Sequence, residues 1–110
     1  MRTLTRRADF LAAAKARKVS LPSFTLQARA RPDAEPGPAR FGFTCSKKVG
    51  DAVRRNRAKR RLRAVARIAL LPHARDGWDY VLIGRHGATA ARPWDDLCDD
   101  ARRALARVHE

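Results

Sequence analysis

Hydrophobic and polar residues alternate along two stretches of the chain, and a third stretch is hydrophobic on both faces. The alternation covers residues 23–31 and residues 40–46. It predicts two half-buried strands, paired antiparallel, with the proline- and glycine-rich residues 32–38 as the loop between them. Residues 80–83 are apolar throughout and predict a strand in the centre of the same sheet.

Three other segments follow the 3.6-residue period of an α-helix. Residues 8–18 are rich in alanine, and residues 51–71 begin at Asp51, a favourable N-cap, and stop before Pro72. Residues 93–108 place apolar side chains at helical spacing, with acids near the beginning and arginines near the end, as the helix dipole favours. These patterns predict three helices that each pack one side against the sheet.

The order helix, two strands, helix, strand, helix predicts an α+β fold, with helices packed against a small sheet. A length of 110 residues fits one domain, so residues 1–110 are expected to form a single unit. Its two cysteines, Cys45 and Cys98, lie among apolar neighbours and are expected to be reduced core residues. The longest apolar run, residues 68–71, is too short to cross a membrane, so we expect a cytoplasmic protein with no membrane partner.

The charge is distributed unevenly along the chain. Lys and Arg total 25 against 11 acidic residues, a net charge of +14, of which residues 1–75 carry +16 and residues 76–110 carry −2. An excess of this size opposes compaction unless a polyanion neutralises it, and nucleic acid is the commonest such partner.

The helix predicted at residues 51–71 carries most of this basic charge on one side. Its apolar stripe and its polar stripe lie on nearly opposite faces: Ala58, Leu62, Val65 and Ala69 form the first, and Asn56, Arg60, Arg63 and Arg67 the second. Like charges at this spacing oppose each other by a few tenths of a kcal/mol per pair, and Asp51 is the only acid between residues 40 and 75. Arginine binds phosphate oxygens in a bidentate manner, so this face is predicted to bind nucleic acid.

RNA is favoured over DNA as that partner, because a strand and not the first helix of a helix-turn-helix precedes the basic helix. The chain offers no catalytic constellation of its own. His73, His86 and His109 have no serine or cysteine beside them in sequence, and the acids of the last helix are explained by the helix dipole. No catalytic residue and no metal site are therefore predicted in the protein.

The sequence from Phe43 to Arg63, FTCSKKVGDAVRRNRAKRRLR, resembles the signature of the bacterial ribonuclease P protein subunit. That signature is a strand ending in Ser-Lys-Lys, a Val-Gly turn, and a helix bearing Arg-Asn-Arg followed by further basic residues. The resemblance extends over nearly the whole chain, from Leu4 and the Asp9-Phe10 pair to the closing helix.

The resemblance implies an α-β-β-β-α-β-α two-layer sandwich with an unusual left-handed βαβ crossover, shared with a domain of a ribosomal protein. The hydrophobic pattern finds only two strands before the basic helix. A short additional strand near residues 19–21 would complete the order. Most crossovers of this kind are right-handed, so pattern reasoning alone predicts the opposite hand.

The resemblance also implies a function, which is endonucleolytic removal of the 5′ leader from precursor tRNA. The large RNA subunit would perform the chemistry with its own Mg²⁺ ions. The protein, an endoribonuclease subunit that binds no cofactor by itself, would bind that RNA and the leader, and not DNA. The residues expected to bind RNA are Lys47, Lys48, Arg54, Arg55, Asn56, Arg57, Lys59, Arg60, Arg63 and Arg67. The residues expected to line the leader cleft are Phe10, Phe24 and Leu26.

Two positions depart from the family pattern. Asp51 stands where the family usually has asparagine, and Ala14 stands where many members have a second aromatic residue. Three other functions remain open at the level of sequence: an rRNA-binding structural protein of ribosomal type, a stand-alone nuclease and a DNA-binding regulator.

Overall fold

The computed structural model describes residues 1–33 and 35–110, apart from the side chain of Lys47. The strands are β1 (Arg2–Thr3), β2 (Arg17–Ser20), β3 (Phe24–Ala30), β4 (Arg40–Cys45) and β5 (Trp78–Gly84). The α-helices are α1 (Arg7–Ala14), α2 (Ala52–Val65), α3 (Ala88–Ala91) and α4 (Trp94–Val108). Three short turns complete the order: η1 (Lys47–Val49), the π-helical η2 (Ala66–Leu70) and η3 (Leu71–His73).

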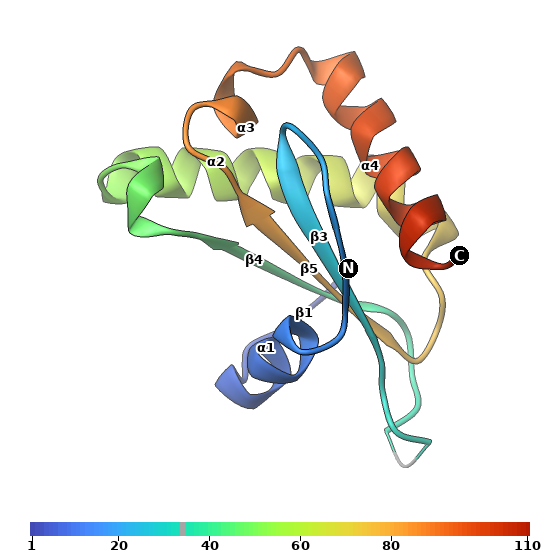
Figure 1. Cartoon of the computed structure of the whole chain (residues 1–110). Coiled ribbons are helices and arrows are strands. Elements are labelled where there is room, and N and C mark those ends of the chain that lie inside the picture. The colour runs from blue at the N-terminus through green and yellow to red at the C-terminus, as the bar shows by residue number, and fades with distance from the viewer. Residues whose placement is uncertain (34) are drawn as a thin grey trace.

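The five strands form one sheet in the order β1-β4-β5-β3-β2 (Figure 1). The predicted central position of residues 80–83 is confirmed, because β5 pairs parallel with β4 and antiparallel with β3. The predicted direct pairing of the first two strands is wrong. β5, apolar on both faces, lies between them, and the loop predicted at residues 32–38 connects two strands that are not neighbours; Ala34 of that loop lies outside the described residues.

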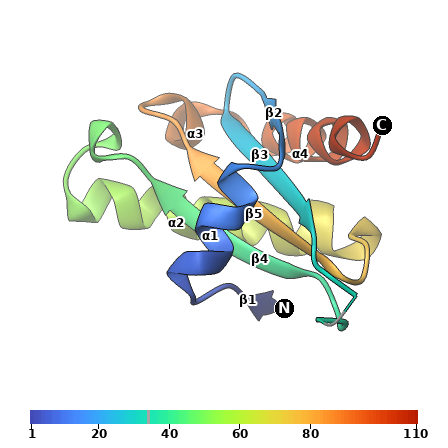
Figure 2. The same cartoon turned by 60° about the horizontal axis from the view of Figure 1, so that its bottom comes forward.

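The additional strand that the resemblance implied is present as β2, and the first helix is correspondingly shorter than predicted. α1 ends at Ala14, and the chain then pairs with β3, where Val19 lies opposite Leu26 and packs against the main core. With β2 in place, the order of the main elements is the implied one. β4, α2 and β5 form the left-handed crossover, with α2 behind the sheet in Figure 2.

The basic helix begins where the sequence predicts and changes geometry before its predicted end. The Asp51 carboxylate accepts a hydrogen bond from the backbone N–H of Arg54 at 3.0 Å, which is the predicted N-cap. The α-helix ends at Val65 and continues as the π-helical turn η2, and Pro72 lies within η3.

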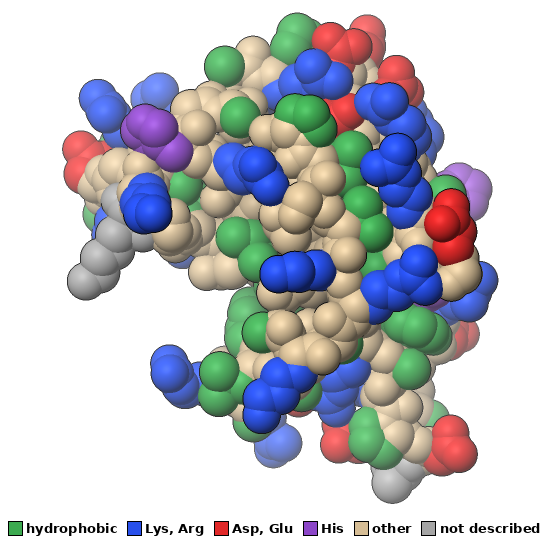
Figure 3. Space-filling model, viewed as in Figure 1, with side chains coloured by type: hydrophobic (Ala, Val, Ile, Leu, Met, Phe, Trp, Pro, Cys, Tyr) green, Lys and Arg blue, Asp and Glu red, His purple; other side chains and the backbone are tan. Residues whose placement is uncertain are grey.

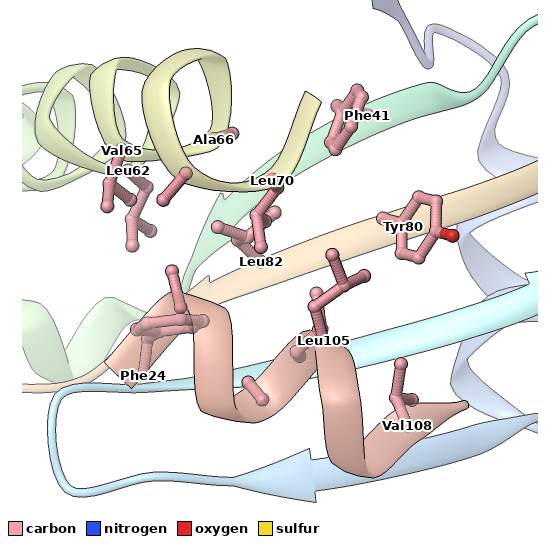
Figure 4. Packing of buried hydrophobic residues seen from close by; sticks show 14 of the residues in the cluster. Phe24, Phe41, Leu62, Val65, Ala66, Leu70, Tyr80, Leu82, Leu105 and Val108 are labelled. Carbon is pink, nitrogen blue, oxygen red and sulfur yellow. The ribbon is translucent and has the colours of Figure 1, made fainter. Parts of the chain in front are cut away.

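Helices cover both faces of the sheet. α2 and α4 pack on one face and enclose the main core, where Phe24, Leu62, Leu82 and Leu105 meet (Figure 4). α1 lies on the opposite face (Figure 2) and encloses a small cluster of Leu4, Ala13 and Val81, with Phe10 packed against it. The described residues contain no helix with the length and apolarity needed to cross a bilayer.

A buried carboxylate fixes the end of the sheet beside α1. Asp79 of β5 is fully buried and accepts hydrogen bonds of 2.8 Å from Arg31 and, through both carboxylate oxygens, from Arg40. Asp9 of α1 lies 3.6 Å from the guanidinium groups of both Arg29 and Arg40. This cluster of ion pairs therefore holds α1 to the sheet.

Candidate nucleic-acid interface

The structure separates the two stripes of α2 onto opposite sides. Ala58, Leu62 and Val65 are buried under the sheet. The predicted RNA-binding residues Lys48, Arg54, Asn56, Arg57, Arg60, Arg63 and Arg67 lie on the outer side and are exposed or half-buried, and Arg55 and Lys59 lie beside them. Lys47 lies on η1 next to this face, but its side chain is outside the described part of the structure.

Among the residues that the structure describes, the cations of this α2 face have no acidic partners. Within residues 1–33 and 35–110, with the Lys47 side chain excepted, every ion pair involves arginines of other elements. Some α2 arginines instead contact uncharged groups. Arg55 donates to the Gly50 carbonyl at 2.7 Å, Arg61 donates to the Thr89 carbonyl at 2.7 Å, and the Arg63 guanidinium lies 5.3 Å from the Phe43 ring centroid. These contacts orient the side chains and leave their charge uncompensated.

Arg67 differs from the other predicted residues of the stripe. The prediction aligned it with Arg63 through the four-residue spacing of an α-helix, but Arg67 lies in the π-helical turn η2. It is exposed, yet α-helical geometry no longer brings it onto the line of Arg60 and Arg63.

A pocket of about 240 Å³ lies beside the first turns of α2. Of its four polar lining residues, the sequence predicted the two on α2 and missed the two that follow β5. Arg54 and Arg57 of α2 face Arg85 and His86, which follow β5. Their position directly after the central strand was the available signal in the sequence. Because β4 and β5 run parallel, the segments that follow them lie at the same edge of the sheet. Arg61 holds this segment to α2 through its hydrogen bonds to the carbonyls of Thr89 and Ala90.

A groove of about 470 Å³ lies on the other face of the sheet, between α1 and the strands. Figure 3 shows a hollow between α1 and the rest of the molecule, with Lys and Arg side chains on both sides of it. Phe10 and Ala14 of α1 form one wall, and Gln27, Val81 and Ile83 line the floor. The groove therefore offers apolar surface and one amide in basic surroundings.

Phe10 owes its place in the groove to a glycine on β4. A Cβ atom added at Gly42 would lie 2.6 Å from Cε1 of Phe10 and 2.8 Å from its Cζ, so a side chain there would displace the ring. The ring thus rests on the bare backbone of Gly42, half-buried, and still lines the groove. Ala14 is exposed one turn later, so the wall is lower there.

The predicted assignment of Phe24 and Leu26 to the leader cleft is wrong. Both are fully buried in the main core under α2 and α4, on the face of the sheet opposite to α1. Successive side chains of a strand point to opposite faces, so it is Thr25 and Gln27 that share the face of α1. The alternation of apolar and polar residues in β3 contained this information. Its apolar side packs against the larger core, and its polar side faces the open groove.

The α2 face and the groove adjoin at one end of the sheet. Thr44 lines the groove near the end of β4, and η1 with Lys48 follows directly and leads into α2. A polyanion bound along α2 and a single strand lying in the groove would therefore meet at this edge.

His109 and the two cysteines take structural positions, whereas His73 and His86 are exposed. Burial raises the pKa of both Cys45 and Cys98, and both thiols are free. The Nε2 atom of His109 lies 2.7 Å from the Tyr80 hydroxyl, and its ring contacts Trp78 edge-on. Burial and, to a smaller extent, the charge of Arg75 lower the pKa of His109. No group of three potential metal ligands occurs among the described residues.

Comparison with known proteins gives a consistent result along the whole chain. The Ribonuclease P family model matches residues 1–109. A ribonuclease P protein component of Ruegeria pomeroyi is 58% identical over 106 residues, which cover 96% of this chain and 85% of that protein.

Two solved structures share the fold. The RNase P protein from Thermotoga maritima has a TM-score of 0.76 at 23% identity, covering 97% of this chain and 96% of that one. A Staphylococcus aureus RNase P protein, described as a mutant with defective mRNA degradation activity, has a TM-score of 0.77 at 23% identity, covering 97% and 87%.

Proposed function

The chain belongs to the ribonuclease P protein family, and from this membership we propose how its two surfaces divide the work. It is the protein subunit of an endoribonuclease that matures the 5′ end of tRNA, in which the RNA subunit is the catalyst. We propose that the α2 face with η1 binds the catalytic RNA, and that the groove beside α1 holds the single-stranded leader of precursor tRNA.

The absence of acidic partners on the described α2 face is the observation that carries the first part. A surface that serves only solubility mixes charges of both signs, because opposite charges at helical spacing stabilise a helix. Here the acids are used elsewhere: Asp79 and Asp100 are fully buried, each with two or more arginines. The guanidinium groups of Arg54, Arg57, Arg60 and Arg63 are left for an external polyanion, and arginine suits backbone phosphates.

The shape of the groove supports the second part. Unpaired bases stack on aromatic side chains, and the half-buried Phe10 presents its ring at the wall. Gln27 on the floor offers an amide donor and acceptor to a base edge, and Arg7 at the wall offers a charge to a phosphate. The leader is the single-stranded segment that precursor tRNA carries and mature tRNA lacks, so the groove would distinguish the two.

The Mg²⁺ ions of the reaction are assigned to the RNA subunit in this proposal. The protein contributes positive charge and substrate orientation at the edge where its two surfaces adjoin. This division predicts that protein alone does not cleave precursor tRNA. The alternative of a protein that degrades RNA by itself makes the opposite prediction.

An omission experiment tests the proposal. Purified protein, the large RNA subunit, precursor tRNA and Mg²⁺ are combined, and each component is left out in turn. We expect cleavage at the mature 5′ end to require the RNA subunit and Mg²⁺, and the protein to restore it at modest Mg²⁺ and salt concentrations. Cleavage by nuclease-free protein without the RNA subunit would overturn the division of work.

The leader assignment is tested separately with Phe10→Ala. Loss of one stacked base costs about 1–3 kcal/mol, so the ratio of precursor to mature tRNA affinity of the holoenzyme should fall by about 5- to 150-fold. Leu11→Ala is the matched control, because Leu11 is the next residue of α1 and is 50% exposed outside the groove lining. An unchanged ratio in a folded Phe10→Ala variant would leave Phe10 as a packing residue only.

A further inference from the structure

Side chains on the α1 face of the sheet fall into rows that cross the strands. Paired residues of neighbouring strands point to the same face, so the strand register defines each row. The first row is Thr44, Ile83, Thr25 and Ser20, from β4 through β5 and β3 to β2. The second row is Gly42, Val81, Gln27 and Lys18, in the same order of strands.

One side of this surface is closed. The third row consists of Arg40, Asp79 and Arg29, and Asp9 of α1 is paired with both of these arginines. Phe10 covers the β4 end of the second row, where it rests on Gly42. The groove is lined by Thr44 and Ile83 of the first row and by Val81 and Gln27 of the second. Beyond this lining, both rows continue across the sheet to β2.

Both rows end at β2 in exposed polar side chains. Lys18 lies opposite Gln27, and Ser20 lies opposite Thr25, with their hydroxyl oxygens 3.3 Å apart. Arg17 lies opposite Ala28 on the other face of the strand. In the part of the chain that the structure describes, Lys18 takes part in none of the ion pairs.

We propose that β2 forms a distal leader subsite, in which Lys18 binds a backbone phosphate of the single-stranded leader and Ser20 binds a phosphate or ribose oxygen. Neighbouring strands lie about 4.8 Å apart, so β2 is about 14 Å from β4, where the ring of Phe10 rests. A nucleotide on β2 is thus a different one from the nucleotide stacked on Phe10 and lies further upstream. This subsite rests on the proposed leader path, and it extends that path to the edge of the sheet.

If this subsite exists, the affinity of the holoenzyme for precursor tRNA depends on leader length, and Lys18 is responsible for part of that dependence. The holoenzyme is titrated with precursor tRNAs whose leaders are lengthened one nucleotide at a time, at several salt concentrations. For the wild type, affinity should rise once the leader reaches β2. Lys18→Ala should lose that rise, and for long leaders alone its log–log salt slope should be shallower by about 0.7, the value for one phosphate on a single strand. Ser20→Ala should lose a smaller part of the rise.

Arg17→Ala is the matched control, since it removes the same charge from the adjacent residue on the opposite face of β2. It should retain the rise at every leader length. Equal behaviour of the Lys18 and Arg17 variants, or a wild type that gains nothing from longer leaders, would overturn the distal subsite. A comparison of the shortest leader with mature tRNA distinguishes failure of the distal subsite from failure of the proposed leader groove. If only the distal subsite is wrong, the holoenzyme still binds the short-leader precursor more tightly than mature tRNA. If the groove is wrong, this preference is lost as well.

Discussion

Arginine occupies two contrasting environments in this protein. Around Asp79, the side chains of Arg31 and Arg40 are held by a buried carboxylate, and the Arg31 side chain is only 2% exposed. On the α2 face, Arg60 and Arg63 point away from the core and no described carboxylate pairs with them. The same side chain therefore stabilises the fold in one region and is available for RNA in the other, and the position of the acids decides which.

The titration of the buried acids reflects this difference. Burial raises the pKa of Asp79, but the hydrogen bonds from Arg40 and Arg31 outweigh burial, so that its pKa lies below the usual value. Asp100 on α4 shows the same balance, with burial opposed by hydrogen bonds from Arg92 and Ser23. Both carboxylates are ionised at neutral pH and match the arginines around them.

Removing the buried charge should have the largest effect. Asp79→Asn leaves Arg31 without a carboxylate in a buried site, and breaking such a pair costs about 3–5 kcal/mol. Urea unfolding measures this loss. Asp95→Asn, the same change at an exposed acid of α4, should stay within about 0.5 kcal/mol of the wild type. If Asp79→Asn lowered the free energy of unfolding no more than Asp95→Asn does, the ion pairs around Asp79 would not stabilise the fold.

Within α2, neighbouring residues should separate stability from binding. Leu62 is fully buried, so Leu62→Ala should lower the free energy of unfolding by about 2–5 kcal/mol. Arg63→Ala, one position later on the exposed side, should change it by no more than about 0.5 kcal/mol. Thermal and urea unfolding of the two variants measures both changes. If Arg63→Ala were the more destabilising, the assignment of buried and exposed faces would be reversed.

Acid should lower the stability of the fold through its two buried carboxylates. The folded-state pKa values of Asp79 and Asp100 lie below the unfolded value of about 3.9, so their contribution to stability is fully present above that pH. It is lost as the pH falls through the folded pKa values, because the unfolded state then binds more protons. The free energy of unfolding should therefore drop below about pH 4, and Asp79→Asn should make this drop shallower. An equally steep drop in the variant would assign the acid sensitivity to other groups.

Much of the fold is encoded in local patterns, and the errors occur where interactions distant in sequence decide. The N-cap at Asp51 and the central position of β5 follow from short-range signals that tertiary packing does not oppose. The short strand β2 contains Arg17 and Lys18, which no strand pattern would favour. It forms because Val19 reaches the main core when paired with β3.

The candidate site likewise has one part that local sequence patterns predict and one part that they do not. The α2 face is predictable because its charges and its apolar stripe belong to one helix. The groove joins α1 to one of the two faces of β3, and selecting Phe24 and Leu26 placed the floor on the wrong face. The burial of Asp100 was likewise invisible, since its partners Ser23 and Arg92 come from other segments, and helix-dipole reasoning alone had explained it.

The salt dependence of binding between the protein and the large RNA subunit tests the central contrast most directly. For Arg60→Ala combined with Arg63→Ala, the log–log slope of affinity against salt should become shallower by about 0.7–0.9 for each phosphate that the variant no longer binds, while the free energy of unfolding stays close to that of the wild type. A double variant that unfolds more easily yet keeps the wild-type slope would contradict the account, because it would place these arginines with those around Asp79.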